Sequence, residues 1–135
     1  MTRVRYRDGT RWESKVGYVR AIRAGDAIYV SGTTAVDDAG EVVGGTSSYD
    51  QARFALTKAV RALGSLGGQV EDVVRTRWFV TKIDDWEEIG RAHREVFREA
   101  PPASTMVGVS RLVDPRLLVE VEIDAVVDSA RAGAP

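Results

Sequence analysis

The stretch LLVEVEIDAVV, residues Leu117–Val127, is the most regular in the chain and predicts a β-strand. Apolar side chains occupy its odd positions, and Glu120, Glu122 and Asp124 lie at even positions between them. Because successive side chains of a strand point to opposite faces, one face is apolar and the other is acidic. The apolar face predicts burial against helices, whereas the acidic face requires water or a charged neighbour.

A second predicted strand carries the complementary charge. Residues Val73–Val80 (VVRTRWFV) place Arg75 and Arg77 on the same face as Phe79. Opposite charges on neighbouring strands attract one another across a sheet. If the two strands are neighbours, these arginines pair with the acidic side chains of Leu117–Val127.

Apolar residues at helical spacing predict a helix over Thr46–Leu66. Ser47 or Thr46 can cap its first free backbone N–H groups, and Gly67–Gly68 supplies a left-handed stop. The apolar stripe, which recurs at intervals of three and four, consists of Ala52, Leu56, Ala59, Val60, Leu63 and Leu66.

A second helix is predicted from Asp85 to about Ala100, where Pro101 and Pro102 prevent its continuation. Asp85 and Glu88 match an acidic variant of the capping box. The apolar face expected to be buried consists of Trp86, Ile89, Val96 and Phe97.

The remaining β-type runs are short and the other segments are polar. We expect further strands at Val4–Tyr6, Tyr18–Arg23, Ala27–Ser31, Glu41–Val43 and Ser104–Ser110. The polar stretch Arg7–Gly17 is expected to be a loop, and the tail Asp128–Pro135 is expected to be frayed. Together these elements predict a single α+β domain in which two helices cover one side of a sheet. The other side is then hydrated or closed by another subunit.

The composition excludes several classes of function. The chain has 135 residues, 19 Lys+Arg, 20 Asp+Glu and a net charge of −1, so general nucleic-acid binding is disfavoured. It has no cysteine, which removes disulfides and thiolate chemistry, and its single histidine, His93, cannot form a zinc site alone. No apolar run is long enough to span a membrane or resembles a signal peptide. A soluble, cytoplasmic domain is expected.

Taken alone, the candidate catalytic groups favour structural roles. His93 lies in a polar run at helical spacing without a G-x-S-x-G motif, and a solvated or interfacial helix histidine is expected. Glu120 with Glu122 fits an acid/base pair, but same-face neighbours on one strand more often form a charge ladder. The glycine pairs lack a phosphate-binding motif. On spacing alone, the chain is only a soluble α+β domain.

Four segments, taken in order, resemble the RidA/YjgF family, also described as L-PSP-type endoribonucleases. The segments are Val16–Arg20 (VGYVR), Ile28–Gly32 (IYVSG), Val73–Lys82 (VVRTRWFVTK) followed by Asp84–Trp86, and Pro101–Thr105 (PPAST) with Arg111–Leu112 and Val119–Glu122. Their order and spacing cover about residues 16–127. Each segment alone is weak evidence for the family. The specificity of the resemblance comes from the order and spacing of all four segments.

The resemblance implies a chorismate-mutase-like fold with a mixed, mostly antiparallel sheet and two helices on one face. It also implies a homotrimer in which the sheets form an inner barrel and small molecules bind in clefts between subunits. Family members of this kind hydrolyse enamines and imines to keto acids and ammonia, and they need neither a metal nor a tightly bound cofactor. An acidic side chain orients the water, and an arginine holds the substrate carboxylate.

The family's site residues match several positions of this chain. By resemblance, the cleft tyrosine corresponds to Tyr18, the Ser-Gly pair to Ser31 and Gly32, and the acid that handles water to Glu120. Tyr18 would contact the ligand, and the Ser31 hydroxyl would polarise a developing charge. Glu120 would transfer protons, provided that its surroundings raise its pKa.

One position departs from the family's pattern. The carboxylate-binding arginine of the deaminase branch corresponds to Ser104, and the residue two positions later is Met106. A neutral hydroxyl cannot replace a bidentate guanidinium group, so the usual 2-imino acid substrate is not expected. Arg20 and Arg111 lie within the matching motifs and are the candidates to substitute for it.

Four functions therefore remain open. The first is hydrolysis of an imine or enamine with an atypical substrate, and the second is non-catalytic binding of a small metabolite in the same clefts. RNA cleavage and a purely structural role are disfavoured alternatives. Loss of activity on truncation of Glu120 would separate the first function from the second.

Overall fold

The computed structural model describes residues 2–128 and 130, so most of the tail predicted to be frayed lies outside the described residues. The strands are β1 (Arg3–Tyr6), β2 (Ala21–Ala24), β3 (Ala27–Thr33), β4 (Val73–Val80), β5 (Ala103–Gly108) and β6 (Val119–Val126). The helices are α1 (Arg11–Val16), α2 (Ser48–Ser65) and α3 (Trp86–Phe97), with single 3-10 turns at Val70–Asp72 and Ile83–Asp85.

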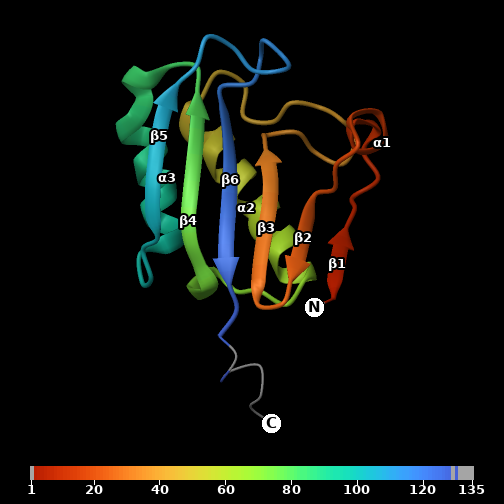
Figure 1. The fold of residues 1–135 in the computed structure, drawn as a ribbon. Helices are drawn as coiled ribbons and strands as arrows, with labels where there is room; N and C mark the ends of the chain where they lie inside the picture. The colour runs from red at the N-terminus through yellow and green to blue at the C-terminus, as the bar shows by residue number, and fades with distance from the viewer. Residues whose placement is uncertain (1, 129, 131–135) are drawn as a thin grey trace.

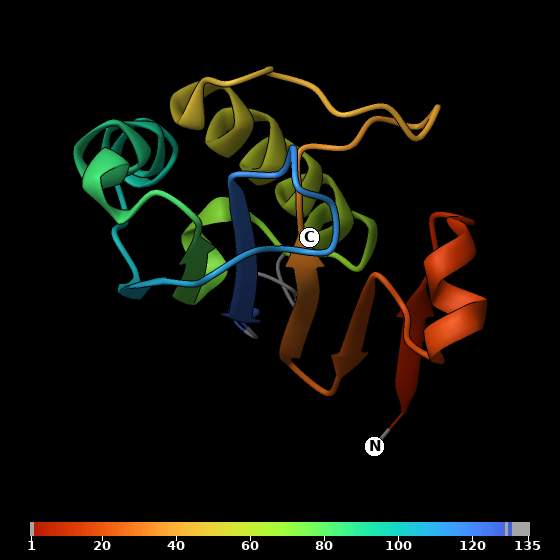
Figure 2. The same ribbon diagram turned by 90° about the horizontal axis from the view of Figure 1, so that it is seen from above.

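The strands form one sheet in the order β1-β2-β3-β6-β4-β5 (Figure 1). Only the β4–β5 pair is parallel among the described strands, and α3 connects these two because parallel neighbours need a crossover. Helices α2 and α3 lie on one face of the sheet, and α1 lies beside β1 at one edge (Figure 2). The predicted α+β class and the mixed, mostly antiparallel sheet are confirmed.

The apolar face of β6 forms the centre of the core. All of its predicted inward positions, Leu117, Val119, Val121, Ile123, Ala125 and Val127, are buried. Helix α2 packs over β3 and β6, and its residues Ala52, Leu56, Ala59 and Leu63 are fully buried. Ser47 caps α2, since its side chain accepts a hydrogen bond from the Asp50 N–H, and Gly67 takes the left-handed conformation (φ 89°) that ends the helix.

The charged faces of β4 and β6 pair as predicted at Arg77. The two strands are antiparallel neighbours, with Arg77 opposite Glu122. The Arg77 guanidinium lies 3.0 Å from Asp124 and 3.8 Å from Glu122. These groups lie on the sheet face that α2 and α3 leave uncovered.

Several local predictions are wrong, each for a physical reason. Part of the polar stretch expected as a loop is the short helix α1, which ends where Gly17 (φ 85°) donates its N–H to the Glu13 carbonyl. The run Glu41–Val43 makes only an isolated bridge, between Val36 and Val42.

The start of α3 also differs from the prediction. Asp85 and Glu88 form no capping box, because their carboxylates accept hydrogen bonds from the Ser48 hydroxyl and the Tyr49 N–H at the start of α2. Trp86 is 56% exposed, so it does not belong to the buried face of α3.

Candidate functional site

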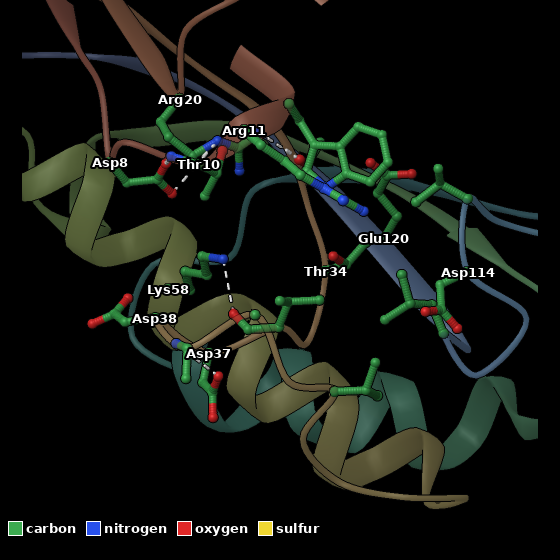
Figure 3. A pocket seen from close by; sticks show the side chains of 18 of the residues that line it. Asp8, Thr10, Arg11, Arg20, Thr34, Asp37, Asp38, Lys58, Asp114 and Glu120 are labelled. Atoms are coloured by element: carbon green, nitrogen blue, oxygen red, sulfur yellow. Dashed lines mark hydrogen bonds and ion pairs between the residues drawn. The ribbon is translucent and has the colours of Figure 1, made fainter. Parts of the chain in front are cut away.

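A cavity of about 800 Å³ opens where α1, α2 and the ends of β3 and β6 meet (Figure 3). Tyr18, Arg20, Gly32 and Glu120 line it. The predicted site residues Tyr18, Gly32 and Glu120 are thus brought together in one chain. Of the two arginines considered as substitutes, Arg20 lines the cavity, whereas the exposed Arg111 is not among its lining residues.

Glu120 packs directly against Gly32. A β-carbon added at Gly32 would lie 2.9 Å from the Glu120 Cδ and closer still to Oε2, so only glycine leaves room for this carboxyl group. The pairing of β3 with β6 shifts between Val30 and Thr33, which marks a bulge at the same place. Bulges often redirect side chains beside functional sites.

Glu120 is a carboxyl group of the cavity whose pKa is raised. Burial raises its pKa, Arg20 lowers it and Glu122 raises it, and the balance is upward. Asp114, which also lines the cavity, behaves in the opposite way, because hydrogen bonds from Arg116 lower its pKa to about 2. Asp114 is therefore held as an anion, whereas the surroundings of Glu120 shift its pKa upward, toward the protonated form.

The Arg20 side chain is buried beside Glu120 and is held by backbone and hydroxyl acceptors. Its two terminal nitrogens donate to the Gly32 carbonyl (2.9 Å) and to the Thr33 hydroxyl (3.3 Å). Its Nε lies 4.0 Å from an Asp8 carboxylate oxygen and has no hydrogen-bond partner among residues 2–128 and 130. The guanidinium also lies 5.4 Å from the centre of the Tyr18 ring. Arg20 therefore brings a positive charge to the wall of the cavity, whereas its Nε is enclosed within the protein.

Ser31 contributes to the shape of the site. Its hydroxyl donates to the Val19 carbonyl at 2.6 Å, and its backbone N–H donates to the Arg20 carbonyl. These bonds hold the backbone at Val19 and Arg20, next to the cavity residue Tyr18. Ser31 is not among the residues that line the cavity.

Ser104 and Met106 lie elsewhere in this chain. Both are on β5, opposite Thr76 and Trp78 of β4, and their side chains share the sheet face that is covered by helices. The buried Thr76 hydroxyl is 2.8 Å from the Ser104 hydroxyl and 2.8 Å from His93 Nε2. Neither Ser104 nor Met106 lines the cavity that contains Glu120.

His93 is a packed residue of the helix–sheet interface. It is half-buried, and its ring lies 4.7 Å from that of Phe97 and 6.0 Å from that of Trp78. Burial lowers its pKa, which favours the neutral imidazole. The expected interfacial role agrees with this position.

Several residues of the site were not predicted, among them three that contact Arg20 or line the cavity. Asp8 approaches Arg20, Thr33 accepts from Arg20, and Lys58 of α2 reaches the cavity and donates to the Val36 carbonyl at 2.8 Å. Asp8 lies in a polar stretch and Lys58 within the predicted helix 46–66, and neither position carries a distinguishing signal in a single sequence. Thr33 directly follows the matched Ser-Gly pair, and this adjacency is the one available indication.

Two further observations concern ligands and membranes. Within residues 2–128 and 130, no three acidic or histidine side chains cluster in a way that could hold a metal ion. In the same part of the chain, no helix is both long and apolar enough to cross a membrane.

Comparisons with known proteins agree with this arrangement. Residues 9–127 match the family model described as endoribonuclease L-PSP. A crystal structure of a YjgF/YER057c/UK114 family member from Mycobacterium tuberculosis superposes with a TM-score of 0.85 and 41% identity, covering 93% of this chain and 100% of that one.

Two sequence relatives are similar over most of their length. An uncharacterized protein of Streptomyces coelicolor is 38% identical over 122 residues, which are 90% of each chain. The 3-aminoacrylate deaminase RutC of Acinetobacter baylyi is 33% identical over 104 residues, which are 77% of this chain and 82% of that one.

Proposed function

Because the chain belongs to the endoribonuclease L-PSP family, which is also the RidA/YjgF family, we propose that it hydrolyses a small imine or enamine. One observation carries the proposal: Glu120, whose pKa is raised by burial, lies in a cavity beside the Arg20 guanidinium. A carboxyl group that is neither fixed as an anion nor remote from a cation can both accept and return a proton. The similarity to a 3-aminoacrylate deaminase supports the same reaction class.

The reaction needs one water and no external oxidant. Glu120 takes a proton from the water as the water oxygen attacks the carbon of the protonated C=N group, which gives a neutral tetrahedral carbinolamine. Glu120 then returns this proton to nitrogen, the C–N bond breaks, and the hydroxyl proton passes to the departing ammonia, so a carbonyl product and ammonium leave. An enamine enters the same sequence after protonation at carbon converts it to the imine. The tight contact with Gly32 holds the carboxyl group in one position, which favours this transfer.

The proposed substrate is recognised differently from the usual 2-imino acid of the family. Ser104 occupies the position of the family's carboxylate-binding arginine and its hydroxyl is bonded to Thr76, so it supplies no positive charge. Within the cavity, the positive charge of Arg20 attracts an anionic group of the substrate. We therefore expect a substrate whose recognition depends on Arg20.

We also propose that the chain assembles as a homotrimer with its ligand sites near the subunit interfaces. The sheet face opposite α2 and α3 carries half-buried charged residues and Tyr29, which is 49% exposed. Covering this face with equivalent sheets would bury that surface. Light scattering coupled to gel filtration should give a mass about three times the 14.7 kDa of the chain, and a monomer mass would contradict the assembly.

An imine-decay assay tests the reaction. Amino-acid oxidase or threonine dehydratase generates the imine, and its disappearance is followed with wild type, Glu120→Gln and Glu122→Gln. Removing the proton-transfer group should reduce the rate by about 10²–10⁴-fold. Glu122 is the matched control, because it lies on the same face of β6 and bonds Arg77 but does not line the cavity.

The assay also separates the alternative functions. If no acidic, aliphatic or aromatic imine decays faster with the wild-type protein, a metabolite-binding protein becomes the better interpretation. If Glu120→Gln and Glu122→Gln retain equal activity, Glu120 is not the proton-transfer group.

A further inference from the structure

Lys58 is distinguished from the other lysines of the chain by its position. The sequence contains three, Lys15, Lys58 and Lys82. Lys15 and Lys82 are exposed, whereas Lys58 is half-buried and lines the cavity. Figure 3 shows the Lys58 amine directed into the pocket, with Glu120 on the opposite side.

The surroundings of Lys58 favour the neutral amine. Burial is the largest influence and lowers its pKa, Asp8 raises it, and Arg20 lowers it again. Two weaker influences come from Asp38, on the loop after β3, and from Arg61, one turn further along α2. Desolvation and a neighbouring cation are the conditions under which lysines become nucleophiles.

A single hydrogen bond orients the amine. Lys58 Nζ donates to the Val36 carbonyl at 2.8 Å, and Val36 also lines the cavity. While this N–H remains on the carbonyl oxygen, the lone pair of a neutral amine points away from that oxygen. Lys58 has no salt-bridge partner within 4.0 Å among residues 2–128 and 130, so no ion pair fixes it as an ammonium.

We propose that Lys58 captures small 2-oxo acids in this cavity as a Schiff base. The amine attacks the carbonyl carbon, and a proton passes from nitrogen to the carbonyl oxygen to give a carbinolamine. Loss of this hydroxyl as water leaves a C=N bond to Nζ, so one amine and one carbonyl give one imine and one water. The positive charge of Arg20, which lines the same cavity, attracts the carboxylate of the ligand. This covalent binding goes beyond the proposed hydrolysis and does not require it.

Reductive trapping tests the inference. The full chain is incubated with pyruvate and cyanoborohydride near neutral pH, and peptide mass mapping gives the labelled fraction of each lysine. Lys58 should be labelled at least about tenfold more than Lys15 and Lys82, because the cavity positions the carbonyl beside the amine. Methyl pyruvate, which lacks the carboxylate charge, should lower this ratio. Lys58→Arg keeps a positive charge but should lose the label at position 58, with circular dichroism as the check on folding.

The outcomes separate this inference from the hydrolysis. Labelling of Lys58 without imine decay supports the inference and contradicts the proposed reaction. Imine decay without preferred labelling of Lys58 supports the proposed reaction and contradicts the inference. Equal labelling of the three lysines, or an unchanged ratio with methyl pyruvate, overturns the capture of 2-oxo acids at this site.

Discussion

Replacement of Gly32 by alanine should reduce the activity strongly while lowering the stability of the fold only slightly. The backbone of Gly32 does not adopt a positive φ, so alanine is permitted there by conformation. The alanine side chain lacks space, however, because its β-carbon would lie 2.9 Å from the Glu120 Cδ. Carbon atoms pack at about 3.5–4.0 Å, so the carboxyl group must move by about 1 Å.

The displacement should affect activity far more than folding. The atoms that must move are at the end of a flexible side chain, so we expect a stability loss of at most about 1 kcal/mol, below the usual range for overpacking. A 1 Å error at a catalytic group can reduce the rate by about 10²-fold, which is the loss expected in imine decay. Because the carboxyl group moves away from its buried position, its pKa should fall toward the ordinary value of 4.5.

Gly90→Ala is the control for Gly32→Ala. Gly90 lies inside α3, and apart from its chain neighbours and the backbone of the helix itself, a β-carbon there meets no atom of the described residues within 4 Å. This substitution should stabilise the protein by about 0.5–1 kcal/mol and leave imine decay unchanged. Thermal melts, the decay assay and NMR titration of the Glu120 carboxyl group measure the three effects. Wild-type activity in Gly32→Ala, together with an unchanged pKa of Glu120, would refute the assigned role of this contact.

Three further predictions use the same reasoning. Thr76→Val should cost about 1–3 kcal/mol in chemical denaturation, because it leaves half-buried His93 without its hydrogen-bond partner, and Ser104→Ala should cost less because Ser104 is exposed. An equal cost would contradict this. The single histidine should titrate below 6.5 by proton NMR, so its contribution to stability should be complete above about pH 6.5 and be lost as the pH falls toward the folded value. A midpoint above 6.5 would be inconsistent with burial. Glu120→Gln should raise Tm relative to wild type more at neutral pH than below pH 4.5, because the raised pKa of Glu120 means that its ionised form weakens the folded state. A pH-independent difference in Tm would argue against this burial.

The sheet and its two covering helices were predictable because their signals are periodic and strong. Alternation in residues 117–127 identified both the buried and the charged face of β6, and Arg77 supplied the partner for its acids. The sequence of helix α2 contains its apolar stripe, and its capping residue and the glycines that end it lie directly beside it. These features depend on local geometry, so a single sequence contains the information.

Features that depend on distant partners were not predictable. Asp85 and Glu88 have the spacing of a cap, but Ser48 and Tyr49 compete for their oxygens once α2 and α3 are packed together. Helix α1 is six residues long and depends on Gly17 and on Glu13, whose carboxylate accepts from the Gly9 N–H. A helix of this length is marginal without such contacts.

Whether the predicted site residues face one ligand depends on the register of the strands, which the resemblance alone does not give. Glu120 pairs with Phe79 of β4, whereas Ser104 pairs with Thr76, an odd number of residues away on the same strand. Side chains alternate along β4, so the proposed proton-transfer group and the residue at the arginine position face opposite sides of one sheet. Within a single chain they cannot share a ligand, and only a second subunit could join them. The cavity that one chain forms instead combines Glu120 with Arg20 and Lys58, and these residues are the ones to vary when substrates are sought.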